Sequence, residues 1–289
     1  MKKQVIIETD IGGDPDDFYA ILYMLHTCDV KAILVSPGFT EQIRVVNGLL
    51  KYCNKEHVLV GSPKVEPGNY IVGSVVKWFL NRYQCDNRYE LSEDILDKLL
   101  KEYPDIHLFG IGPLNSIGPY LSTKKPRINT ICMQGGFVQH SLYRPQVYCE
   151  KFEGVERRAT YNLGGNIAGA DYITDLNSDI GERYFIGKTV CHPMVLDRTV
   201  FDHYKQEPTS PEMKLFNDSV EFLIKKSHSK IFHDPVAACI YNNLDIALFL
   251  KGYMVRNKLE WSSVEYELGY NLCVDCNTEL VWERIFKFT

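Results

Sequence analysis

The 289 residues of the chain, 45% of them hydrophobic and 24% charged, have the composition of an ordinary globular protein and suffice for one large α/β domain. Its 32 basic and 37 acidic residues leave a formal net charge of −5, which argues against a nucleic-acid partner. No apolar run reaches bilayer length and the N-terminus lacks the apolar core of a signal peptide, so we expect a soluble, cytoplasmic protein without membrane contact.

Apolar segments with strand character alternate with segments of helical spacing along the chain. This order predicts an α/β fold with a Rossmann-like core, in which a mostly parallel sheet is flanked by helices in a single domain, residues 1–289. Strands are expected at residues 4–7, 30–36, 57–61, 106–111, 128–133, 184–191 and 270–276. Helices are expected from about residue 16 and at residues 41–54, 75–83, 92–103, 167–176, 198–206, 210–229 and 236–241.

Three of these predicted strands, at residues 4–7, 106–111 and 128–133, end in glycine turns. Parallel strands place their carboxyl ends at one edge of a sheet, where open α/β sheets build their sites. We therefore expect the three turns to lie together at that edge.

The first of these turns is strongly acidic, because Asp10, Asp14, Asp16 and Asp17 fall within eight residues. Carboxylates on one tight loop repel one another unless a cation or backbone donors compensate them. Oxygen ligands favour calcium or magnesium over zinc, so a divalent ion is the simplest compensator. Alternatively, these aspartates only cap a helix and interact with its dipole.

A second informative segment is the triplet from His233 to Pro235, which opens an apolar helix. Aspartate as N-cap and proline in the first helical position form a good capping pair, so the triplet can be explained as a helix start alone. Considered together with the acidic loop, Asp234 would instead complete the coordination shell of a metal ion, and His233 would be a proton donor beside it.

In this order the motifs resemble those of the inosine–uridine type nucleoside hydrolases, of which the chain would be a divergent member. The resemblance extends from residue 4 to about residue 240. The matching residues are Asp10, Gly12-Gly13, Asp16-Asp17, the Gly-Pro-Leu-x-x-Ile segment from Gly112 to Ile117, Gly135-Gly136, Asn162, and the triplet from His233 to Pro235.

The resemblance implies calcium-dependent hydrolysis of the N-glycosidic bond of a ribonucleoside. The Ca²⁺ ligands would be Asp10, Asp17, Asp234 and the backbone carbonyl of Ile111. Asp10 would also accept the proton of the attacking water. His233 would protonate the leaving base, or else serve only as a positioning group.

The resemblance also implies a substrate site for a small nucleoside or nucleotide and a role in nucleoside salvage, with a homodimer or homotetramer as the assembly. Asp16 and Asn162 would hold ribose hydroxyls. Gln134, in the third glycine turn, is a further expected substrate contact. The base pocket is expected among residues 62–73, 137–158 and 222–232.

The chain departs from the family pattern at several positions. Five residues instead of three separate Asp10 from the aspartate pair, which leaves the role of Asp14 open. No asparagine follows the second strand at residues 36–39. Thr160 and Gly154 replace a glutamate and an asparagine that recognise the ribose 5′-hydroxyl in the family.

Two arginines, Arg157 and Arg158, directly precede Thr160. Because the guanidinium group suits phosphate oxygens, we predict that these three residues bind a 5′-phosphate or another 5′-modified nucleoside; a modified base is a further option. Alternatively, the arginines are solvated surface charges.

Two other functions compete with nucleoside hydrolysis. The first is a catalytically inactive homologue that acts as a ligand-binding protein, although Asp10, Asp17 and Asp234 are all retained. The second is a metal-dependent phosphohydrolase, which would need an Asp-x-Asp motif, whereas Gly12 stands at the position of its second aspartate.

Overall fold

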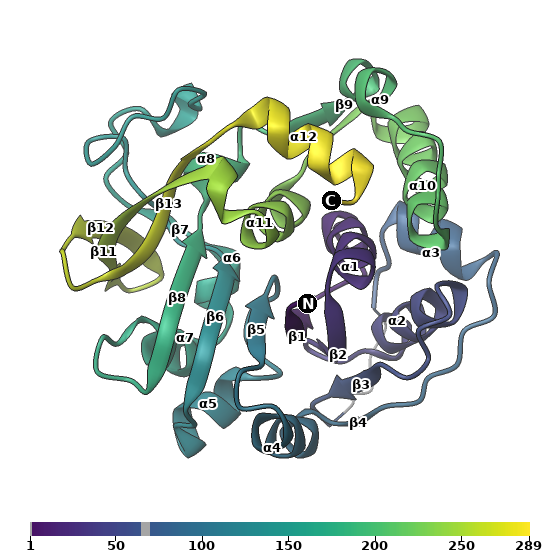
Figure 1. Cartoon of the computed structure of the whole chain (residues 1–289), viewed down its shortest axis with the longest axis horizontal. Helices are drawn as coiled ribbons and strands as arrows, with labels where there is room; N and C mark the ends of the chain where they lie inside the picture. Colours follow the sequence, from purple (N-terminus) through teal and green to yellow (C-terminus); the bar gives the residue numbers. More distant parts are fainter. Residues whose placement is uncertain (1, 65–69) are drawn as a thin grey trace.

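An 11-stranded mixed sheet runs through the computed structural model, which describes residues 2–64 and 70–289 (Figure 1). From one edge to the other its strands are β4 (Glu90–Leu91), β3 (Leu59–Ser62), β2 (Asp29–Val35), β1 (Gln4–Thr9), β5 (His107–Gly110), β6 (Ile128–Gln134), β8 (Ile180–Ile186), β13 (Tyr270–Cys276), β11 (Ala247–Asn257), β12 (Glu260–Glu265) and β7 (Arg158–Ala159). The strands from β4 to β13 run parallel, and the remaining three pair antiparallel with their neighbours. The predicted mostly parallel α/β fold is therefore confirmed.

Apolar side chains on both faces of the central strands explain why the sheet is covered on both sides. In β1, Val5 and Ile7 belong to the core on one face, whereas Ile6 between them belongs to the core on the other. Successive side chains of a strand point to opposite faces, so a continuous apolar run is the pattern of a strand buried on both sides.

Helices cover the two faces of the sheet. The core on the first face includes residues of α1 (Asp16–Thr27), α2 (Thr40–Tyr52), α3 (Ser74–Leu80), α8 (Lys188–Cys191), α9 (Arg198–Tyr204), α10 (Pro211–Ser227), α11 (His233–Asn242) and α12 (Thr278–Lys287). The core on the second face includes residues of α4 (Ser92–Glu102), α5 (Gly118–Lys124), α6 (Tyr161–Gly165) and α7 (Ile167–Thr174). Two short strands, β9 (Val195–Asp197) and β10 (Ser229–Ile231), form a separate antiparallel pair.

The structure differs from the expected elements in the second half of the chain. The strand predicted at residues 184–191 is wrong in its bounds, because β8 ends at Ile186 and Lys188 begins a short helix after Gly187. The hairpin of β11 and β12 and the C-terminal helix α12 were not predicted. Within the described residues, no helix has both the length and the apolar character needed to cross a membrane.

The fold brings the predicted loops together as expected. Strands β1, β5 and β6 are neighbours in the sheet, and their carboxyl ends therefore share one edge. Helix α1 packs against α11, so the helix starts at Asp16 and His233 meet beside that edge.

Candidate active site

A pocket of about 340 Å³ lies where the carboxyl ends of β1, β5 and β6 meet the first turns of α1 and α11. All predicted site residues except Arg157 and Arg158 line it, namely Asp10, Asp16, Asp17, Ile111, Gln134, Thr160, Asn162, His233 and Asp234. Asp14, Gly135, Tyr161 and Lys188 line it as well. Segments that are far apart in the sequence thus contribute to one concave site.

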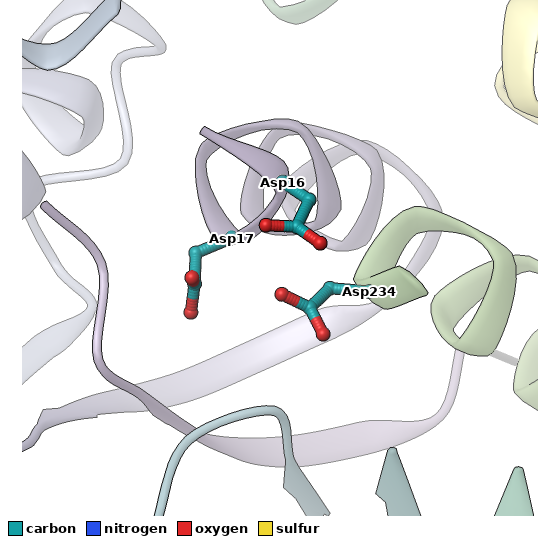
Figure 2. A group of neighbouring side chains, drawn as sticks. All are labelled: Asp16, Asp17 and Asp234. Carbon is teal, nitrogen blue, oxygen red and sulfur yellow. The ribbon is translucent and has the colours of Figure 1, made fainter. Parts of the chain in front are cut away.

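Three carboxylates form a tight group in this pocket. Asp16, Asp17 and Asp234 each bring one oxygen to within 4.8 Å of the others. Figure 2 shows the first two on the opening turn of α1 and Asp234 on that of α11, facing a common space. All three are buried, with 3%, 3% and 5% of their surface exposed. An all-oxygen group of this kind suits a hard divalent cation.

The electrostatics of the group reflect this crowding. Burial, together with the charges of Asp10 and Asp16, raises the pKa of Asp17 well above its usual value. Burial and the charges of Asp16 and Asp17 raise the pKa of Asp234 in the same way. Buried carboxylates with raised pKa values are costly to ionise, so a bound cation would stabilise their charged form.

Asp10 lies at the end of β1 and is only partly buried. Burial and the negative charge of Asp16 raise its pKa to about 7. Its backbone carbonyl accepts a hydrogen bond of 3.0 Å from Gln42 Nε2, which also donates to Ser36 O at 2.9 Å. Among the described residues, the group of carboxylates within 4.8 Å contains Asp16 and does not contain Asp10.

Two residues in and beside the acidic loop, Thr9 and Gly12, fix its conformation. Thr9 Oγ1 donates to Asp17 Oδ1 at 2.5 Å and accepts from the Ile11 amide at 3.1 Å, which fixes the carboxylate beside the strand end. Gly12 has a φ of +140°, and a Cβ there would lie 2.5 Å from a ring carbon of Tyr70. Only glycine fits this turn without strain.

Asn162 connects the ends of β5 and β6. Its Nδ2 lies 2.9 Å from Ile111 O, Gln134 O and Gln134 Oε1. An amide nitrogen has two hydrogens, so it can donate fully to only two of these oxygens at once. Asn162 therefore orients the Ile111 carbonyl, which the sequence predicts as a metal ligand, in addition to lining the pocket.

His233 lies between Asp16 and a second histidine that the sequence analysis missed. Its Nδ1 is 3.6 Å from Asp16 Oδ2, and its Nε2 is 3.3 Å from His192 Nδ1. Lys151 Nζ lies 3.3 Å from His192 Nε2. Burial and the charges of Lys151 and His233 lower the pKa of His192 to about 4, so its ring is neutral at pH 7.

These distances assign the ring tautomers. An ammonium group only donates hydrogen bonds, so His192 Nε2 must accept from Lys151 and its own proton must sit on Nδ1. That proton points to His233 Nε2, which leaves the proton of a neutral His233 on Nδ1, facing Asp16.

Lys230 is a second residue that the sequence analysis missed. Its Nζ lies 2.5 Å and 2.6 Å from the two carboxylate oxygens of Asp14 and 3.8 Å from Asp16 Oδ1. Burial acts to raise the pKa of Asp16, but the hydrogen bond with His233 and the charge of Lys230 outweigh it and lower that pKa. Asp14, whose role was open, thus forms an ion pair at the mouth of the site. A lysine three residues before His233 was the available signal.

Other predicted residues lie away from the pocket. Arg157 and Arg158 are exposed, and Arg158 is in the edge strand β7, opposite Trp261 of β12. Part of the expected rim at residues 62–73 falls on residues 65–69, which are outside the described residues. The described residues of 137–158 and 222–232 do not line this pocket.

Comparison with known proteins bears on the fold. No family model matches the sequence, and no curated protein matches it. A plant nucleoside hydrolase aligns with a TM-score of 0.74 at 16% identity, over 100% of this chain and 99% of its own. An inosine-uridine preferring nucleoside hydrolase from Bacillus anthracis aligns with a TM-score of 0.71 at 12% identity, over 100% of this chain and 99% of its own. A purine-preferring ribonucleoside hydrolase from Gardnerella vaginalis aligns with a TM-score of 0.66 at 15% identity, over 99% of each chain. The chain therefore has the fold of the nucleoside hydrolases.

Proposed function

We propose that the chain hydrolyses the N-glycosidic bond of a ribonucleoside with the help of a bound calcium ion. The observation that carries this proposal is the group of buried carboxylates at the carboxyl edge of the sheet, in a fold shared with nucleoside hydrolases. The solved structures are at most 16% identical in the comparisons given above, so the activity rests on the site itself.

The donor set fits the ion. Asp10, Asp17 and Asp234 supply carboxylate oxygens, and Ile111 supplies a carbonyl oxygen at the end of β5. Asp16 lies in the same tight group and is available either to the ion or to a ribose hydroxyl. When bound, calcium supplies a Lewis acid that lowers the pKa of a water and orients the ribose diol.

The protein side chains supply the proton transfers. Asp10 accepts a proton from the attacking water, whose oxygen forms a bond to the anomeric carbon of the ribose. The bond between that carbon and the base nitrogen breaks, and the base departs with the electron pair. His233 supplies the proton that neutralises the base from Nδ1, the ring nitrogen that carries it in the tautomer assigned above, and it lines the pocket beside Asp234.

A second candidate is a homologue that binds a ligand without turnover. The observation that favours it is the position of Lys230. Its ammonium group lies at the acidic loop and compensates part of the negative charge of that loop without any ion. Retention of all four predicted ligand residues, Asp10, Asp17, Ile111 and Asp234, on one pocket favours the enzyme.

A nucleoside panel with a sugar readout separates these candidates. Purified protein in calcium buffer is incubated with purine and pyrimidine ribonucleosides, and free ribose is measured as reducing sugar. The proposal predicts release from at least one nucleoside and a loss of about 10²–10⁴-fold in Asp10→Asn, which removes the general base. Asp105→Asn is the matched control, because Asp105 is exposed just before β5, at the opposite end of that strand.

The control should release ribose at the wild-type rate. If wild-type protein binds nucleosides and calcium yet releases no ribose from any of them, the ligand-binding candidate replaces the enzyme. If Asp10→Asn retains the full rate, the assigned base is wrong.

A further inference from the structure

The pocket has a cationic end that the proposed reaction does not use. Lys188 lines the pocket directly after β8, two strands beyond β5 in the sheet order β1-β5-β6-β8. Its side chain is half-buried, and its Nζ donates one hydrogen bond, 2.9 Å long, to Ala159 O. An ammonium group has three donors, so two remain for other partners.

Thr160 adds a second polar group at the same end. It directly follows the residue whose carbonyl binds Lys188, and it also lines the pocket. Thr160 is 3% exposed, and its hydroxyl has no hydrogen-bond partner among the described residues. A buried hydroxyl without a partner is costly, so a ligand atom that pairs with it would recover that cost.

The electrostatics of this end are positive. Within the described residues, no carboxylate forms an ion pair with Lys188. Burial and the charges of Arg158 and Lys151 lower the pKa of Lys188, which indicates that its charge is not compensated by the protein. Arg158 therefore contributes to the field near this end although it does not line the pocket.

The two ends of the pocket thus differ in sign. The acidic group lies at β1, α1 and α11. Lys188 follows β8, across β5 and β6 from that group, and Thr160 follows Ala159, whose carbonyl binds Lys188. We infer that the substrate carries an anionic oxygen group, a phosphate or a carboxylate, that binds Lys188 and the Thr160 hydroxyl while its ribose diol faces the carboxylates. This inference rests on the proposed function for the orientation of the ribose, and it replaces Arg157 and Arg158 as the predicted anion contacts with Lys188.

Binding measurements test the inference without requiring turnover. Calorimetry on the calcium-loaded protein compares ribose 5-phosphate with ribose, and orotidine with uridine, so that each pair differs by one anionic group. The variants are Lys188→Gln, Lys188→Arg and, as matched control for the lost charge, Lys98→Gln, because Lys98 is exposed on α4. Thermal unfolding of each variant checks that it folds.

We expect wild type to bind the anionic member of one pair about 10- to 100-fold more tightly, the range for hydrogen bonds to a charged group. Lys98→Gln and Lys188→Arg should keep this preference, and Lys188→Gln should lose most of it. Preference for ribose 5-phosphate assigns the anion to the 5′ end of the ribose, and preference for orotidine assigns it to the base. If Lys188→Gln does not fold, Thr160→Val should show a smaller loss in the same direction.

Equal binding within both pairs, or a preference that Lys188→Gln and Thr160→Val leave unchanged, would overturn the inference. These outcomes are distinguishable from failure of the proposed function. A protein that prefers the anionic ligands but releases no ribose refutes hydrolysis alone, whereas one that hydrolyses neutral nucleosides and shows no preference refutes the anion site alone.

Discussion

The Nε2 atom of His233 lies 3.3 Å from the Nδ1 atom of His192. Because Lys151 donates to His192 Nε2, the proton between the two rings is assigned to His192. His233 Nε2 therefore accepts a hydrogen bond in this arrangement, and its own proton faces Asp16. Lys151 stands at the other end of His192, so the three side chains form a continuous path toward the pocket. Through this path a proton lost from His233 to a leaving base can be replaced.

The role of His233 as a proton donor predicts a loss that depends on the leaving group. His233→Ala should lower kcat for natural nucleosides by about 10²–10⁴-fold, the usual contribution of a general acid. It should affect a nitrophenyl riboside much less, because nitrophenolate leaves without a proton. Steady-state kinetics on both substrates measure the difference. Equal losses would remove His233 from the acid role and leave it as a positioning group.

His192 should act only through His233, because it does not line the pocket. His192→Phe keeps an aromatic ring of similar volume against Phe152 but removes both ring nitrogens. We expect a smaller loss of kcat than in His233→Ala, with the same dependence on the leaving group and little change in KM. A loss that is equal for natural nucleosides and nitrophenyl ribosides would show that the substitution acts on packing instead.

Asp14 is predicted to be dispensable for the metal. Its carboxylate is exposed and already bound by Lys230, and among the described residues the tight group of buried carboxylates does not include it. Asp14→Asn should therefore bind calcium nearly as well as wild type, whereas Asp234→Asn should bind it much more weakly. Titration of both variants with calcium in a calorimeter gives the comparison. Parallel losses in the two variants would make Asp14 a ligand.

Calcium should stabilise the protein more at alkaline pH. Burial raises the pKa of Asp10 to about 7 and that of Glu8 to about 8, from usual values of 3.8 and 4.5. In the calcium-free protein, the folded chain thus holds more protons than the unfolded chain at pH values between the usual and the raised pKa values of these two groups. The free energy of unfolding should therefore fall as pH rises from about 4 to about 8.

Melting curves at pH 6 and pH 8.5, with chelator or with calcium, measure this dependence. The chelated protein should melt at a lower temperature at pH 8.5. Calcium should raise Tm at both values, and more at pH 8.5, because fewer protons must be displaced. Calcium at about 100 times its Kd adds roughly 2.7 kcal/mol to the stability. A Tm that is independent of calcium at both pH values would show that the carboxylates do not hold the ion.

The sequence predicted the parts of the site that short motifs encode. Asp10, Asp16 and Asp17 follow a buried strand, and Asp234 opens a helix, so local patterns place them at the ends of elements. The order of the glycine turns then placed these ends at one edge of the sheet. The mostly parallel sheet followed from apolar runs of strand length, which are buried on both faces.

Single residues without a motif could not be predicted in the same way. His192, Lys188 and Lys230 reach the site, or the side chains that line it, through tertiary packing. Only Lys230 has a sequence signal, its place three residues before His233. Arg157 and Arg158 precede Thr160 in sequence, yet both arginines, one just before the edge strand β7 and one in it, are exposed while Thr160 is buried. Sequence proximity therefore pointed to the right segment, in which Thr160 lines the pocket and the two arginines do not.

The most direct test of calcium-dependent hydrolysis is the rate of ribose release as a function of free calcium, measured on protein stripped with a chelator. The substrate is the nucleoside or nucleotide released fastest in the panel. If the carboxylates bind calcium, ribose release should fall to the background rate in chelator. The full rate should return on titration with calcium and saturate at one bound ion per chain. Full activity in chelator, or no release at any calcium concentration, would contradict the central claim.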